Sequence, residues 1–349
     1  MKTLGELKIK CRRPTLENFA WLITGIFRSR SVSTGRIALE LGWDIKSVSI
    51  TRRLSRLLDN KSVRVRQWYR STAESLLKAQ AEALGEIRLI VDASLIGNKH
   101  QLLMVAIAFR GRAIPIAWTW VRHKRGHSSA RLQKALLGYV NRLIPDGTPV
   151  VIVGDSEFGN IPVIQLVAGW GWSYVFRQQS SHLVKFADQD QWEKFGSFIT
   201  KHGQKQWLGQ ALLTKEHGYT ANLYIEFKPG EKEAWLLATN LKTQLELCRA
   251  YKRRMWIEEL FGDMKSNGFD LEKTKLRHFN RLSRLTLAVV LLIAWLIDTG
   301  SRVIKNGLRK WVDRNERRDY SIFRIGYNYV KRKIGQCKMP KIRLKPYFS

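Results

Sequence analysis

The chain has 349 residues, of which 44% are hydrophobic and 26% charged, a globular composition that excludes wholesale disorder and leaves room for two or three domains. Its 61 Lys and Arg residues outnumber its 29 Asp and Glu residues and give a net charge of +32. Because a chain this basic attracts polyanions, nucleic acid is the first partner to expect and an anionic membrane surface the second.

The basic residues are concentrated at the two ends of the chain. Residues 1–66 hold 15 basic and 5 acidic side chains, and residues 302–349 hold 15 and 3. Two ends that grip DNA on either side of a central core would explain this distribution. The alternative is that charge alone keeps the two ends soluble.

Residues 1–80 are expected to form a helical region that binds DNA. Apolar residues between positions 16 and 27 recur at helical spacing, and two short helices joined by a turn that contains Gly42 should follow. This pair resembles a helix-turn-helix, whose second helix would present four basic side chains to a DNA groove or to phosphates: Lys46, Arg52, Arg53 and Arg56. The alternative is a pair of scaffold helices that makes no DNA contact.

From residue 87 onward the hydrophobic pattern changes to that of β-strands. We expect strands over 86–96, 101–109 and 113–121, a helix over 130–144, a strand over 149–155, a helix over 161–170 and a strand over 172–178. Three successive strands followed by helix, strand, helix and strand predict a mixed α/β sheet of the ribonuclease H type, flanked by helices. Residues 87–177 would form the first part of this core.

The polar, Gln- and Lys-rich residues 178–233 predict a small β-rich insertion. The core resumes over residues 234–300, with a strand over 234–241, a long helix over 243–266 and a buried helix around the apolar run 285–297. This run is shorter than the roughly 20 residues that a membrane span needs. Residues 301–349 then form a basic C-terminal segment.

Neither the cysteines nor the first residues point to secretion. The three cysteines are far apart, which excludes a disulfide framework and gives no zinc-ligand spacing. The first 20 residues are charged and have no apolar signal core. We therefore expect the protein in a reducing cytoplasm.

Two aspartates follow apolar segments of predicted strands. Asp92 lies near the end of the first strand, and Asp155 ends the fourth. Carboxylates at the C-terminal ends of strands face the crevice where ligands bind in open α/β folds. Their hard oxygen atoms suit Mg²⁺ or Mn²⁺, so we interpret both residues as candidate metal ligands. Either residue alone can also be explained as a turn residue or a helix cap.

The helix predicted over 243–266 carries a polar face of mixed charge. Four residues with offsets of 0, 3, 7 and 14 fall within about 60° of one another, at about 100° per residue: Tyr251, Arg254, Glu258 and Lys265. Glu259, the nearest other acidic residue, lies about 80° from Tyr251. The neighbouring arc is apolar and can pack on the sheet. The alternative is a solvated face with ordinary ion pairs between successive turns.

The spacing Y-x2-R-x3-E-x6-K of these four residues resembles the signature of the insertion-sequence 4 group of DDE transposases. The resemblance extends over residues 87–300, with Asp92 and Asp155 at the first two acidic positions and Glu258 at the third. The β-rich insertion and the helical N-terminal region are also traits of this group. The sequence departs from the family pattern after each aspartate, where it has Ser156 in place of a common arginine and Ala93-Ser94 in place of a frequent threonine.

The resemblance implies an enzyme that performs cut-and-paste transposition, with cleavage at the DNA ends and strand transfer, often through a hairpin intermediate. Asp92, Asp155 and Glu258 would hold two Mg²⁺ or Mn²⁺ ions that carry the chemistry. The implied partners are double-stranded DNA, namely the terminal inverted repeats and the target, and a second copy of the chain in a homodimeric synaptic complex. Such an enzyme would work in a prokaryotic cytoplasm on the nucleoid, without a membrane.

Four further residues receive DNA-binding roles from the resemblance. Arg254 and Lys265 would hold phosphates near the scissile bond. Tyr251 would donate its hydroxyl to a backbone phosphate. Trp235 would stack against a base that is flipped out of the terminal duplex. A tryptophan next to two leucines can equally belong to the core.

Other functions stay open at this point. A non-catalytic DNA-binding regulator would explain the charge and the N-terminal helices, but not the strand-end aspartates together with the mixed helix face. A nuclease of the same fold would use the same carboxylates without strand transfer. Binding to a membrane surface is less favoured, because no separate amphipathic helix with a broad apolar face is evident.

Overall fold

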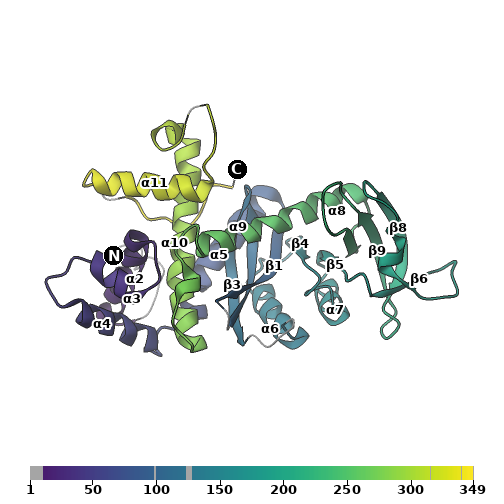
Figure 1. Cartoon of the computed structure of the whole chain (residues 1–349), viewed down its shortest axis with the longest axis horizontal. Coiled ribbons are helices and arrows are strands. Elements are labelled where there is room, and N and C mark those ends of the chain that lie inside the picture. Colours follow the sequence, from purple (N-terminus) through teal and green to yellow (C-terminus); the bar gives the residue numbers. More distant parts are fainter. Residues whose placement is uncertain (1–10, 98–99, 123–127, 315, 339, 349) are drawn as a thin grey trace.

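The computed structural model describes residues 11–97, 100–122, 128–314, 316–338 and 340–348. Figure 1 shows the N-terminal helices at one end of the molecule and a long sheet that runs through the middle to the opposite end. Residues 1–10 of the expected DNA-binding region lie outside the described residues.

The N-terminal region is helical, as its sequence predicts. It consists of α2 (Arg13–Ser29), α3 (Thr34–Glu40), α4 (Ser47–Asp59) and α5 (Val65–Leu84). In the turn between α3 and α4, Gly42 has a φ of 60°, a left-handed conformation that glycine adopts without a steric penalty. Helix α4 buries one apolar stripe, with Ile50 and Leu54 at its centre, and turns its basic side chains outward.

The first part of the core also follows the predicted order. It contains β1 (Ile87–Ile96), β2 (His100–Phe109), β3 (Arg112–Arg122), α6 (Ala130–Asn141), β4 (Val150–Gly154), α7 (Ile161–Gly169) and β5 (Ser173–Arg177). Strands β1, β2 and β3 pair antiparallel, whereas β4 runs parallel to β1 and β5 runs parallel to β4. The resulting order β3-β2-β1-β4-β5 is consistent with the predicted ribonuclease H-like sheet.

The polar segment over 178–233 is rich in strands, as predicted, and these strands extend the core sheet. The segment contains β6 (Leu183–Phe186), β7 (Glu193–Lys194), the short helix η1 (Phe195–Phe198), β8 (Lys205–Leu213) and β9 (Tyr219–Glu226), and β10 (Trp235–Thr239) follows. Strand β10 pairs antiparallel with both β5 and β9. Within the described residues the sheet therefore has ten strands, in the order β3-β2-β1-β4-β5-β10-β9-β8-β6-β7.

The prediction of a single long helix over 243–266 is wrong, because the chain forms two helices there. They are α8 (Gln244–Tyr251) and α9 (Met255–Met264), separated by a 3₁₀ turn, η2 (Lys252–Arg254). Helix α8 packs against β4 and β5, whereas α9 packs against β1, β2 and β3. Since neighbouring strands of a sheet are twisted relative to one another, the break lets each helix follow its own strands. Figure 1 shows the two helices along one side of the sheet, with α6 and α7 on the other.

The apolar run predicted as a buried helix lies in α10 (Phe279–Lys305), which is longer than the run itself. This helix is long and apolar enough to cross a membrane, but 89% of its most apolar window is buried inside the protein. It contacts the N-terminal helices α2, α4 and α5 as well as β3 and α9. Helix α10 is therefore the shared core between the N-terminal region and the sheet.

The last part of the chain folds back on α10. It contains η4 (Leu308–Trp311) and α11 (Ile322–Gly335). A further short helix, η3 (Leu271–Lys273), lies on the other side of α10 in the sequence, between α9 and α10. Helices α10 and α11 cross at Gly300 and Gly326, where a side chain on either glycine would collide with the backbone of the opposite helix. The crossing therefore requires glycine at both positions.

Candidate active site

The two predicted aspartates lie side by side on neighbouring parallel strands. Val91 of β1 is in register with Gly154 of β4, so Asp92 and Asp155 are the next residues on the two strands. A side chain at Gly154 would press on Val91 and on Phe176 of β5, and its absence allows the strands to pack closely beneath the aspartates. Strand β4 ends at this point, whereas β1 continues beside β2.

Glu258 approaches these aspartates from α9. The helix buries Ile257, Leu260, Phe261 and Met264, and this apolar stripe fixes its orientation on β1, β2 and β3. Glu258 then lines the same cavity as Asp92 and Asp155. Its neighbour Glu259 points elsewhere, because its Oε2 lies 2.6 Å from Nη1 of Arg112 on β3. The structure thus separates the two adjacent glutamates.

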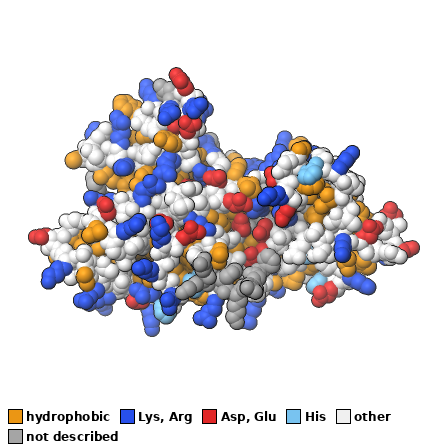
Figure 2. Space-filling view, viewed as in Figure 1, with side chains coloured by type: hydrophobic (Ala, Val, Ile, Leu, Met, Phe, Trp, Pro, Cys, Tyr) orange, Lys and Arg blue, Asp and Glu red, His pale blue; other side chains and the backbone are white. Residues whose placement is uncertain are grey.

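The cavity that gathers the three carboxylates has a volume of about 560 Å³. Its polar lining consists of Asp92, Ser94, Asp155, Ser156, Arg177, Arg254, Glu258 and Lys265. Figure 2 shows acidic side chains gathered near the middle of the visible face, with Lys and Arg side chains spread over much of the remaining surface. A small acidic centre therefore lies within a strongly basic protein.

Arg254 connects the strand and the helix of this site. Its Nη2 donates to Oε1 of Glu258 at 2.6 Å, and its Nη1 lies 3.4 Å from Oδ2 of Asp92. The guanidinium is mostly buried, with 16% of the side chain exposed. A single cation thus partly neutralises two of the three carboxylates and holds α9 against β1.

Burial and nearby carboxylates raise the pKa values of two groups at the site, Asp92 and Tyr251. Burial, and after it the negative charge of Asp155, raise the pKa of Asp92 to about 7, with Arg254 opposing both effects. Burial also raises the pKa of Tyr251 to about 12, and both Asp155 and Asp92 contribute in the same direction. The charge of Asp155 therefore acts on both buried groups.

The loop after β4 fixes the second aspartate. Oδ1 of Asp155 accepts a hydrogen bond of 3.0 Å from the backbone N–H of Glu157. The buried Glu157 carboxylate in turn accepts from the backbone N–H of Ser128 at 2.8 Å and from its hydroxyl at 2.5 Å. Gln133 of α6 donates to the backbone oxygen of Glu157 at 3.1 Å. The position of Asp155 is thus set by a buried polar network that reaches α6.

The other residues of the predicted helix face reach different places. Lys265 lies just beyond the end of α9, lines the cavity and makes an ion pair of 3.1 Å with Glu272. Tyr251 is buried at the end of α8, and its ring meets that of Trp235 edge-on at 4.8 Å between centroids. The prediction of one continuous helix face is wrong, because a 3₁₀ turn interrupts the helix between Tyr251 and Glu258. Glu258, Arg254 and Lys265 nevertheless share the cavity.

Trp235 lies on β10, between the core and the strands that extend the sheet. It is half-buried, and Nζ of Lys228 lies 3.8 Å from the centre of its ring. The ring thus packs against Tyr251 at its edge and carries a cation over one face.

The predicted basic residues of the N-terminal region lie on and just before α4. Lys46, Arg52, Arg53 and Arg56 are all exposed. Nε of Arg53 donates to Oδ1 of Asn18 at 2.5 Å, and its guanidinium stands 5.1 Å from the Trp43 ring centre. Arg53 therefore also contributes to packing within the helical region.

Arg177 lines the cavity, but the sequence patterns did not single it out. It ends β5, the parallel neighbour of β4, and its Nη2 donates to Oε2 of Glu233 at 2.8 Å and to the backbone oxygen of Ala234 at 2.9 Å. The rule that located Asp92 and Asp155, which selects polar residues at the ends of parallel strands, also finds Arg177 when applied to β5.

The donor set suits a hard divalent cation. Carboxylate oxygens are the ligands that Mg²⁺ and Mn²⁺ prefer, and a cation between Asp92 and Asp155 would offset both the burial of Asp92 and the repulsion from Asp155 that raise its pKa. Among the described residues, no three His, Cys, Asp or Glu side chains are gathered closely enough to form a ready metal site. The guanidinium of Arg254 lies between two of the candidate ligands, so a metal ion would have to share or replace its contacts.

Carboxylates gathered beside neighbouring strands, beneath a helix that carries another, are an arrangement that can hold divalent ions against a phosphodiester. Residues 84–296 match the family model described as the transposase DDE domain. Because this match spans more than half of the chain, the protein belongs to the transposase DDE family. Membership implies nuclease and transesterase activity, and enzymes of the family typically use divalent metal ions.

The chain is also similar to a piggyBac transposase, solved by cryo-electron microscopy in a synaptic complex with hairpin DNA. The TM-score is 0.43 and the sequence identity is 12%, over 98% of this chain and 78% of that chain. A comparison with curated proteins finds no significant match.

Proposed function

We propose that the protein is a cut-and-paste DNA transposase of the insertion-sequence 4 group. It would cleave DNA at the ends of its element and join those ends to a target. The observation that carries this proposal is the convergence of Asp92, Asp155 and Glu258 on one cavity, with Arg254 in contact with two of them. The spacing of Tyr251, Arg254, Glu258 and Lys265 supports the assignment to this group.

Asp92, Asp155 and Glu258 would hold two Mg²⁺ or Mn²⁺ ions. When bound, such ions activate an oxygen nucleophile and stabilise the leaving oxygen of a phosphodiester. Arg254 is placed to orient Glu258 and to neutralise charge beside Asp92. Lys265 lines the same cavity and would hold a phosphate of the bound strand.

Tyr251 and Trp235 would contribute to the DNA end together. Tyr251 is buried beneath Trp235, and its ring supports the indole edge-on. In this proposal Trp235 stacks against a base flipped out of the terminal duplex, and Lys228 above the ring moves to a phosphate. Tyr251 would act mainly through Trp235, with its hydroxyl near a backbone phosphate.

The other regions would bind and assemble the DNA ends. In this proposal residues 1–80 form the DNA-binding region and contact the terminal inverted repeats through Lys46, Arg52, Arg53 and Arg56. Residues 87–177 and 234–300 form the catalytic core, residues 178–233 the β-rich insertion, and residues 301–349 the basic C-terminal segment. Pairing of two DNA ends would require a homodimer.

A cleavage and joining assay tests the proposal. The substrate is a DNA that carries the sequences flanking the two sides of the coding region, and the reaction contains Mg²⁺ and a target plasmid. A transposase cuts at the flanks and yields joined plasmid products. Cleavage without joined products would instead identify a nuclease, and binding without cleavage would identify a regulator. Asp155→Asn serves as the matched control, because it should bind the ends and fail to cut them.

A further inference from the structure

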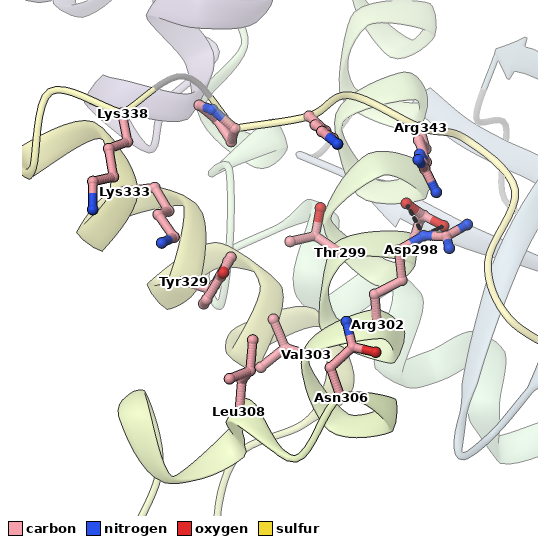
Figure 3. Close-up of a pocket in the computed structure, with 12 residues that line it drawn as sticks. Asp298, Thr299, Arg302, Val303, Asn306, Leu308, Tyr329, Lys333, Lys338 and Arg343 are labelled. Carbon is pink, nitrogen blue, oxygen red and sulfur yellow. Dashed lines mark hydrogen bonds and ion pairs between the residues drawn. The ribbon is translucent and has the colours of Figure 1, made fainter.

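A second cavity of about 470 Å³ lies outside the candidate active site, between the C-terminal half of α10, α11 and the chain that follows it. Figure 3 shows side chains from all three segments around it. Five of the residues that line it are basic: Arg302, Lys333, Lys338, Lys341 and Arg343. The cavity therefore accounts for part of the positive charge of the C-terminal segment, which the active site does not use.

The walls of this cavity are held in place by specific contacts. Nε1 of Trp295 donates to the backbone oxygen of Lys341 at 3.2 Å, and Nη2 of Arg302 donates to the backbone oxygen of Lys345 at 3.1 Å. The backbone N–H of Tyr347 donates to the hydroxyl of Ser301 at 3.3 Å. The chain after α11 is thus fixed against α10, and its basic side chains belong to a built wall.

The positive charge of the cavity is poorly balanced. Its one acidic lining residue is Asp298, which is 1% exposed and whose two oxygens lie 3.0 and 3.2 Å from Nε of Arg302. Lys333, Lys338 and Lys341 make no ion pair with a carboxylate within the described part of the chain. Because like charges repel in a confined space, five cations around one carboxylate favour the binding of an anion.

The neutral groups of the cavity narrow the class of anion. Thr299, Asn306 and Tyr329 line it as well, and each carries a hydrogen-bond donor. Ammonium and guanidinium groups combined with hydroxyl and amide donors are the groups that contact phosphate oxygens in protein–DNA complexes. A phosphate group is therefore the ligand that this lining fits best.

We propose that this cavity binds backbone phosphates of double-stranded DNA, separately from the site of cleavage. The inference rests on the proposed transposase function, which supplies the DNA. Contacts to phosphates fix the position of a duplex without reading its sequence. The C-terminal segment would therefore hold DNA of any sequence, such as the DNA that flanks the element or the target.

The test measures DNA binding by the full chain in EDTA, so that it does not depend on cleavage. The probe is a fluorescent duplex of arbitrary sequence, and its affinity is measured as salt is raised from about 50 to about 200 mM. The site variant carries Lys333→Gln, Lys338→Gln and Lys341→Gln. The control variant carries Lys201→Gln, Lys215→Gln and Lys232→Gln, which replace three exposed lysines of the β-rich segment 178–233. Both variants remove the same net charge.

We expect the slope of log affinity against log salt to become shallower by roughly two to three in the site variant, and by less than about one in the control. Equal slopes in the two variants would overturn the proposal. The single variant Lys333→Gln provides a second reading if the triple variant unfolds, with an expected change of roughly one.

A titration with inorganic phosphate distinguishes a site for free phosphate from a site for the phosphates of DNA. Saturable binding of inorganic phosphate that the site variant loses, with no change in its DNA salt slope, would show a site for free phosphate and overturn the DNA assignment. Cleavage by the wild type with Mg²⁺ is measured in parallel on the flank substrate. Failure of that reaction counts against the proposed function, whereas the salt slopes judge the cavity alone.

Discussion

Arg254 and Asp92 are 162 positions apart in the sequence, yet Nη1 of Arg254 lies 3.4 Å from Oδ2 of Asp92. The same guanidinium donates to Glu258 one turn further along the chain. This contact joins the strand and the helix that carry the proposed metal ligands. It also gives the acidic centre a resident cation, with which any metal ion must share the carboxylates.

Arg254→Gln should shift the pH dependence of DNA cleavage toward higher pH. Arg254 lowers the pKa of Asp92, so removing it raises that pKa above its present value of about 7. If the ionised carboxylate is the active form, the rising limb of the rate profile moves to more alkaline pH, and the maximal rate falls. Arg70→Gln, which breaks an exposed pair with Glu74, is the control. An unchanged profile in Arg254→Gln would contradict the proposed role.

The two adjacent glutamates of α9 should respond differently to substitution. Glu258→Gln should reduce cleavage by about a hundredfold or more, because it removes a proposed metal ligand and the loss of a residue that only supports such a ligand already costs about 10- to 100-fold. Glu259→Gln should leave the cleavage rate close to wild type, because Glu259 pairs with Arg112 outside the cavity. Single-turnover rates on the flank substrate measure both effects. The reverse pattern would show that Glu259 is the functional glutamate.

Asp92→Asn should raise the free energy of unfolding of the metal-free protein, relative to wild type, by more at pH 8 than at pH 5. The pKa of Asp92 is about 7 in the folded chain, above its ordinary value of 3.8. Because folding raises this pKa, the stability that the protonated Asp92 side chain contributes is complete below pH 3.8. That stability is lost as the pH rises through about 7, where the buried side chain ionises. At about 1.4 kcal/mol per pKa unit, the effect amounts to a few kcal/mol at most. Thermal unfolding in EDTA at both pH values measures it.

Asp263→Asn is the matched control for this measurement. Burial raises the pKa of Asp263 to about 7 as well, and Arg112 opposes that rise. Both variants should therefore gain stability at pH 8 in EDTA. Added Mn²⁺ should remove the advantage of Asp92→Asn, because the ion stabilises the wild-type carboxylate, and should leave that of Asp263→Asn unchanged. Equal responses of the two variants to Mn²⁺ would argue against a metal at Asp92.

Lys265→Ala should weaken binding of the DNA end and make its salt slope shallower by roughly one phosphate contact. Glu272 pairs with Lys265 at 3.1 Å, so Glu272→Gln should free the ammonium group and strengthen binding. Fluorescence anisotropy with the terminal duplex over a range of salt concentrations measures both variants. Identical slopes in wild type and Lys265→Ala would exclude a phosphate contact by this lysine.

Much of the fold could be predicted from local patterns. Alternating and β-branched runs located β1 to β5 and β10, and the apolar run in α10 predicted a buried helix. The break at η2 could not be predicted in this way, because it depends on how α8 and α9 follow different strands of a twisted sheet. The sharing of one sheet by β5, β10 and β9 likewise depends on pairing between distant segments.

Strand ends pointed to Asp92 and Asp155, and the family resemblance pointed to Glu258, and the structure places all three around one cavity. The helical spacing itself was not a sound guide, because η2 interrupts the helix on which it was argued. Arg177 could have been predicted only by extending the same reasoning to the neighbouring strand β5. The buried network at Glu157 could not be predicted, because it depends on a tertiary contact with Ser128. The basic cavity beside α11 forms where segments between residues 298 and 343 fold back on one another, and the sequence alone indicates only that this region is positively charged.

Binding of Mn²⁺ to the protein with its DNA end, followed by electron paramagnetic resonance, measures whether Asp92, Asp155 and Glu258 hold metal ions. Wild type is compared with Asp155→Asn at equal protein and DNA concentrations. We expect wild type to bind about two ions per chain and the variant to lose at least one of them. Equal numbers of bound ions in the two proteins would contradict the claim that these carboxylates form a metal-dependent centre for cutting DNA.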